Sequence, residues 1–365
     1  MRVIFCNIAY MSNYCGVTEI DKPQNGGKYI EENEDGGECY NFLDYNGKCY
    51  GYFMHHGEQV HIERIEGVSA SDDFAEDVTV IWTAKSPIIN GTVIVGWYRN
   101  ADVFREWQFI NGYRLGISRN FNIVADSCNC RLLPEYRRTF EIPRASKSGA
   151  GKGIGQSAIW FAESEESKNG IVADVLSYIE DYERNDYDFI NDVITEEMLN
   201  LKSFERLTFE QYIEKAKNTD LHPLEAIKCI NSAIVIKEDD EALLIKTQLL
   251  AREIFRFNDA IPYAQKSFEI DPDYLDTLIM LFDIYMITEQ HEKAVDFGIL
   301  VIEHKGFSDL NDEDKLYLYY SISEQYMQMG KKSQAEEYFN ICNEMEYASE
   351  CSADIDYLRD CIAEI

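Results

Sequence analysis

The stretch NDAIPYAQKSFEIDPD, residues 258–273, decides the fold of the C-terminal half, because its pattern occurs four times along the chain. The other copies are HPLEAIKCINSAIVI at 222–236, HEKAVDFGILVIEHK at 291–305 and KKSQAEEYFNICNEME at 331–346. The four copies align on one alanine each, at intervals of 34, 34 and 41 residues: Ala226, Ala260, Ala294 and Ala335. The longer interval contains GFSDLND, residues 306–312, which could supply the seven additional residues. A period of this length predicts stacked pairs of helices.

These copies resemble tetratricopeptide (TPR) repeats at further positions. A residue small enough for two helices to approach closely follows each alanine after seven residues: Ala233, Ser267, Val301 and Cys342. Nine residues before an alanine, where the family often places tyrosine, the chain has Ala251, Tyr285 and Tyr326. The first copy departs from the family, because KEDD at 237–240 stands where the second copy has Pro272. The resemblance covers about residues 205–348.

The resemblance implies an all-α TPR solenoid whose inner helices form a groove for a protein partner. The segments expected to line it are LLIKTQLLAREIF (243–255), TLIMLFDIYMI (277–287) and YLYYSISEQYMQM (317–329). The final piece, CSADIDYLRDCIAEI at 351–365, is expected to cap the last repeat. Residues 201–365 carry a net charge of −18 and lack the Lys and Arg clamp that grips acidic tails, so we expect a basic or neutral partner. Self-association, or docking onto the chain's own basic segment, is the alternative.

The first 165 residues follow a different pattern, with short runs rich in β-branched and aromatic residues. VTVIWTA (78–84) and TVIVGWY (92–98) are separated by KSPIING (85–91), which ends in an Asn-Gly pair that favours a tight turn, so they predict an antiparallel hairpin. YNGK at 45–48 predicts a second tight turn. We therefore expect an α+β, two-domain chain in which a β-rich, barrel-like N-terminal domain precedes the solenoid. The expected domains are a β-rich recognition domain at 1–165, an acidic helical linker at 166–204, and TPR-like repeats with a capping helix at 205–365.

Charge is distributed unevenly in this chain of 365 residues, which has a net charge of −32. The net charge is −9 over residues 1–90, +5 over 91–160 and −28 over 161–365. A strongly acidic protein repels phosphate backbones, so nucleic-acid binding is disfavoured except through the one basic segment. The chain has ten cysteines, no secretion signal and no run of 18 apolar residues, which predicts a cytoplasmic protein with no membrane span.

GTVIVGWYRNADVFREWQ, residues 91–108, gathers aromatic and basic side chains inside that basic segment. Strict alternation along a strand would place Val93, Val95 and Trp97 on one face, and Gly96 would leave space beside Trp97 for a ligand or another backbone. Aromatic rings beside arginines can stack a base and bind its phosphate. The candidate stacking residues are Trp97, Tyr98 and Trp160, and the candidate phosphate ligands here are Arg99 and Arg105. The alternative is that the aromatic residues fill the core while the arginines are solvated.

The stretch IPRASKSGAGKGIGQSAIWF, residues 142–161, is a glycine-rich basic segment. Its backbone amides and its cations, Arg144, Lys147 and Lys152, could bind phosphate. It is not a P-loop, because Gly153 follows Lys152 where that motif has Ser or Thr. A surface loop without a ligand is the alternative.

The stretch MHHGEQVHIERI, residues 54–65, holds His61 and Glu63, which, with Asn100, are candidates for lining a polar pocket. No zinc-binding spacing and no catalytic motif is present in the sequence, so we expect neither a metal nor a cofactor nor a catalytic residue.

Several segments of the N-terminal half, among them VHIERI (60–65) and TVIVGWYRNADVFRE (92–106), resemble a bacterial PUA/SRA-like β domain found beside restriction-type nuclease modules. The resemblance implies recognition of a modified base by flipping it into an aromatic pocket. We therefore expect a non-enzymatic adaptor, with a role in bacterial defence, whose first domain recognises a nucleic acid or nucleotide and whose TPR domain recruits a protein. A pure protein-interaction scaffold and a nucleotide-acting enzyme are the alternatives.

Overall fold

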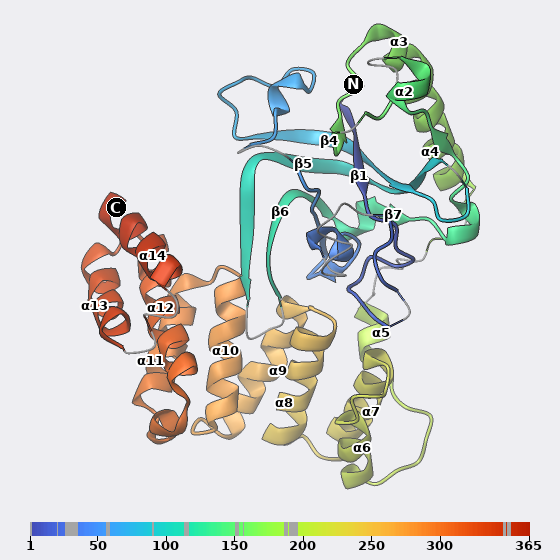
Figure 1. Ribbon diagram of the computed structural model, residues 1–365. Coiled ribbons are helices and arrows are strands. Elements are labelled where there is room, and N and C mark those ends of the chain that lie inside the picture. The colour runs from blue at the N-terminus through green and yellow to red at the C-terminus, as the bar shows by residue number, and fades with distance from the viewer. Residues whose placement is uncertain are drawn as a thin grey trace. The chain divides into compact units, whose positions relative to one another are not determined.

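The computed structural model (Figure 1) divides into two compact units, Met1–Ile110 with Ser118–Val193, and Ile194–Ile365 with Asn111–Ile117. The structure describes residues 2–19, 21–25, 36–55, 59–89, 91–112, 117–149, 153–155, 157–185, 189, 196–345, 348 and 352–365. The first unit is built on a mixed β-sheet and the second is helical. The predicted combination of a sheet domain with a helical region is therefore confirmed.

The sheet has the strand order β2-β3-β6-β5-β4-β1-β9, with β7 and β8 also paired to β5. In chain order the strands are β1 Val3–Ile8, β2 Asp44–Tyr45, β3 Lys48–Gly51, β4 Phe74–Lys85, β5 Thr92–Gly112, β6 Ile117–Asp126, β7 Cys130–Leu132, β8 Glu141–Ile142 and β9 Ile159–Trp160. β1 runs parallel to β4 and antiparallel to β9. Over the described residues the strand path ends at β2 and at β9, so the expectation of a barrel-like domain is corrected to an open sheet. An open sheet is stable here because separate layers cover both of its faces.

Both predicted antiparallel pairs occur, and the two-residue turn is seen between β2 and β3. β4 and β5 pair antiparallel from Lys85 opposite Thr92. The turn between β2 and β3 places Asn46 and Gly47 at φ values of 53° and 87°, the positive values that a two-residue turn of this type requires.

The predicted alternation along β5 is wrong beyond Val95. The register between β4 and β5 shifts at this residue, which has no partner of its own in β4. Such a bulge reverses the faces of the residues that follow. Val95 therefore packs in one core with Tyr98, whereas Trp97 packs in the opposite core with Ile94.

The helices α2 Ala145–Ser148, α3 Glu165–Ser167 and α4 Ala173–Arg184 belong to the first unit. Residues 173–184 were expected to form part of a linker. Val175 and Ile179 of α4 are fully buried in the same core as Trp97 and Phe5, so this helix covers one face of the sheet. The other face is covered largely by residues that precede β4, including Tyr14 and Phe42.

The second unit consists of helices that each contact the next from α6 to α14. Their bounds are α5 Glu196–Asn200, α6 Phe209–Ala216, α7 Pro223–Ile236, α8 Asp240–Gln248, α9 Phe257–Ile270, α10 Leu275–Ile287, α11 His291–Glu303, α12 Asp312–Gln328, α13 Lys332–Glu344 and α14 Ser352–Glu364. Figure 1 shows them side by side in a row. α14 packs on α12 and α13 through Ile355, Leu358 and Ile362, so the C-terminal segment does lie against the last helices of the row.

The alanines that define the sequence period lie on every second helix, α7, α9, α11 and α13, and each is at most 2% exposed. The small residues seven positions later, Ala233, Ser267, Val301 and Cys342, are fully buried. Small buried side chains allow neighbouring helices to approach closely. In the described part of the chain, no helix is long and apolar enough to span a membrane.

Candidate functional site

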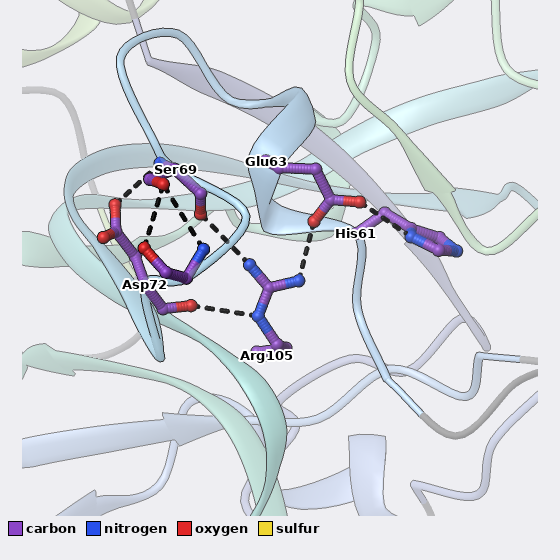
Figure 2. Close-up of polar contacts among 6 residues, drawn as sticks. His61, Glu63, Ser69, Asp72 and Arg105 are labelled. Atoms are coloured by element: carbon purple, nitrogen blue, oxygen red, sulfur yellow. Dashed lines mark hydrogen bonds and ion pairs between the residues drawn. The ribbon is translucent and has the colours of Figure 1, made fainter.

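The candidate site with the best-defined geometry is a polar network around Arg105 of β5 (Figure 2). The Arg105 side chain is 13% exposed, and its Nη1 donates to Glu63 Oε2 at 2.7 Å. Its Nε donates to the carbonyl of Asp72 at 2.9 Å and its Nη2 to that of Ser69 at 3.2 Å. His61 Nδ1 lies 2.9 Å from Glu63 Oε1. One guanidinium thus fastens two parts of the 61–72 segment to the sheet.

Electrostatics fix the protonation state of Glu63. The hydrogen bond from Arg105 is the largest of several effects that lower the pKa of the Glu63 carboxyl to about 2. The carboxylate therefore stays ionised at every pH near neutrality and orients the imidazole of His61, whose side chain is 68% exposed. An exposed imidazole held by a carboxylate can carry a proton to or from a ligand. The predicted grouping of His61 and Glu63 is present, and Arg105 joins it.

An open cavity of about 390 Å³ lies beside this network. Its lining includes Asp72, Asp73, Glu76 and Arg2. Because three carboxylates and only one guanidinium line it, this cavity suits a basic ligand better than a phosphate. In the described residues, no group of three or more His, Cys, Asp or Glu side chains is placed to hold a metal ion.

We expect Glu63→Gln to lower the free energy of unfolding at neutral pH by about 0.5–1 kcal/mol, because the pair with Arg105 is partly exposed. The folded pKa lies below the ordinary value of 4.5, so the stabilisation by Glu63 is complete above pH 4.5 and is lost as pH falls through about 2. Urea unfolding of both proteins between pH 7 and 2 should show a difference that shrinks with acid. Glu106→Gln, at an exposed position of the same strand, is the control. A difference that stays constant down to pH 2 would contradict the assignment.

The structure places the two predicted stacking residues of β5 on opposite faces of the sheet. Trp97 is fully buried, donates from Nε1 to Glu183 Oε1 at 2.8 Å, and packs edge-on against Tyr182 of α4. Tyr98 is also fully buried, and its ring stands steeply inclined to those of Trp82 and Phe42, at 71° and 81°. In this arrangement neither ring offers a face to a ligand, which favours the core alternative for both.

The other predicted aromatic residue, Trp160 of β9, is partly exposed and packs against Phe5 with ring centroids 4.9 Å apart. The space beside Gly96, where a ligand was expected to fit, is occupied by the backbone of β7. A Cβ there would lie 2.4 Å from the carbonyl oxygen of Arg131 in β7, so the glycine permits the close approach of a second backbone.

The predicted phosphate ligands are not gathered at one place. Arg99 pairs with Glu183 at 3.1 Å, so Glu183 holds both Trp97 and Arg99. Arg144 Nη1 donates to the carbonyl of Gly155 at 3.3 Å. Lys152 and the side chain of Lys147 lie outside the described residues. Asn100 is exposed at φ 51° in a bulge of β5, away from any pocket described here.

Three cations with little exposure were not singled out from the sequence: Arg119, Arg138 and Lys246. Only Lys246 stands in an apolar run, LLIKTQLL at 243–250, and that context was the available signal. Lys246 of α8 is 3% exposed, donates to Asn231 Oδ1 at 2.6 Å and lies 3.8 Å from the centroid of the Tyr263 ring. Burial lowers the pKa of the Lys246 amine to about 8.

The sequence matches no known family model, and a search of curated proteins finds no similar sequence.

Proposed function

We propose that this chain is a non-enzymatic binding protein of the cytoplasm whose helical unit is a TPR solenoid that holds a protein partner. The observation that carries the proposal is the burial of Ala226, Ala260, Ala294 and Ala335 on every second helix. Repeats of this kind put the intervening helices, α8, α10 and α12, in equivalent positions, where side chains of successive repeats form one continuous binding surface.

Charge favours a basic or neutral partner segment. Residues 201–365 carry 34 acidic and 16 basic residues, and several of the lysines are already paired within the unit. A basic segment would be attracted to this surface and its association would weaken with salt.

Recognition of a nucleic acid by the sheet unit is less favoured by the contacts. Arg99 and Arg105, the cations expected to bind phosphate, are both hydrogen-bonded to carboxylates of the chain. A catalytic role would rest on His61 and Glu63, and the network around them is explained by anchoring of the 61–72 segment to β5.

A photo-crosslinking amino acid placed at Gln328 of α12 in the full chain tests the proposal. We expect one discrete adduct in cells that produce the protein naturally, and weaker crosslinking in lysate as salt is raised. The matched control is Ile341 of α13, which is 40% exposed on the alternate set of helices. Absence of an adduct at 328, or the same adduct from both positions, would overturn the proposal.

A further inference from the structure

Arg119 of β6 carries a positive charge inside the sheet unit that no described carboxylate neutralises. Its guanidinium carbon lies 4.6 Å from the centroid of the Tyr45 ring and 5.3 Å from that of Tyr40. Its Nη2 donates to the carbonyl of Tyr50 at 3.3 Å, while Nε and Nη1 are enclosed and have no hydrogen-bond acceptor among the described residues. The residue as a whole keeps partial exposure, so solvent can reach it.

The surroundings of this charge differ from those of three other arginines in the basic segment. Arg99 and Arg105 each bond a carboxylate, and Arg138 bonds three carbonyls. The Arg119 guanidinium contacts two tyrosine rings and makes one long hydrogen bond. Burial lowers the pKa of its guanidinium, and the groups that act against this effect are tyrosines and a cysteine, not carboxylates.

A desolvated cation with unfilled donors is costly unless an anion accompanies it. The rings of Tyr40 and Tyr45 attract the charge, but they accept hydrogen bonds poorly. They also restrict the guanidinium to one orientation, so less side-chain entropy is lost when a ligand binds. A planar, prealigned guanidinium of this kind matches the oxygens of a phosphate or a carboxylate.

We propose that Arg119, flanked by Tyr40 and Tyr45, is the anchor of an anion-binding site for a phosphate-type oxyanion on the sheet unit. Nε and Nη1 have no acceptor among the described residues, so they are the donors that the oxygens of the ligand occupy, and the ligand enters where the residue is partly exposed. The site is separate from the protein-binding surface of the helical unit and does not depend on it.

Isothermal titration of the full chain with inorganic phosphate, at constant ionic strength maintained with chloride, tests the site. We expect saturable binding that Arg119→Gln weakens about 10- to 100-fold, as is typical for loss of a hydrogen bond to a charged group. Arg64→Gln is the matched control, because Arg64 is an exposed arginine paired with Glu163 at 2.7 Å. Its affinity for phosphate should equal that of the unmodified chain.

A second titration with adenosine monophosphate distinguishes free phosphate from a nucleotide as the source of the oxyanion. Equal affinities support the site and assign it to the free anion, whereas tighter binding of the nucleotide supports it and assigns it to a phosphate monoester. If Arg119→Gln does not fold, Arg119→Lys keeps the charge and loses the planar donors, and it should still weaken binding. Binding no stronger than that of chloride, or affinity unchanged in Arg119→Gln or Arg119→Lys, would overturn the proposal.

Discussion

Trp97→Ala should lower the free energy of unfolding of the sheet unit by about 3–5 kcal/mol, the usual loss for a fully buried tryptophan. The ring is completely enclosed between β5 and α4, and its indole N–H donates to Glu183. The substitution removes the ring contacts, leaves a cavity and deprives the Glu183 carboxylate of one donor. Urea unfolding followed by circular dichroism measures the loss.

Two variants separate packing from hydrogen bonding at this position. Trp97→Phe keeps an aromatic ring but loses the donor, so we expect a smaller loss of about 1–3 kcal/mol. Phe109→Ala is the control, since Phe109 lies on the same strand with 59% exposure and its replacement should change stability by about 0.5 kcal/mol or less. A Trp97→Ala protein as stable as the Phe109→Ala protein would show that the ring is not part of the core.

This expected loss also limits what a binding experiment can show. If Trp97→Ala and Arg99→Ala together abolished binding of an oligonucleotide, unfolding of α4 from the sheet would explain the result, because both residues hold Glu183. Only a variant with unchanged stability can identify a stacking residue.

The helical unit was the more predictable part of the chain because its signal is local. Each repeat is specified by residues within about 34 positions, so small residues such as Ala260 and Ser267 mark the close contacts directly in the sequence. The hairpin of β4 and β5 was predictable for the same reason, since only the short segment 86–91 separates two apolar strands.

The sheet unit was less predictable because its decisive contacts are distant in sequence. A single bulge at Val95 places Trp97 on the face of the sheet opposite to Val95, and the alternating apolar residues give no sign of it. The partner of Arg99 is 84 residues away and that of Arg105 is 42 residues away. The sequence therefore identified basic side chains near aromatic ones, but it could not show that the chain's own carboxylates already satisfy them.

Arg138→Met should lower the free energy of unfolding of the sheet unit by about 3–5 kcal/mol. The substitution removes a buried guanidinium and leaves the carbonyl groups that it binds without a donor. The residue is 2% exposed, and its guanidinium donates to the carbonyls of Leu133, Met11 and Ser12. Methionine fills a similar volume without a donor, so three carbonyls lose their partner while packing changes little.

Arg137→Met provides the matched control for this effect. Arg137 is the preceding residue and is exposed, so its replacement should change stability by about 0.5 kcal/mol or less. Arg138→Lys keeps the charge but cannot reach three carbonyls in three directions, and we expect it to recover only part of the loss.

Because the bonds to Met11 and Ser12 join positions more than 120 residues apart, hydrogen exchange at the amides near residues 9–14 should accelerate in Arg138→Met and not in Arg137→Met. Equal exchange in the two variants would mean that the N-terminal segment is held by its apolar contacts alone.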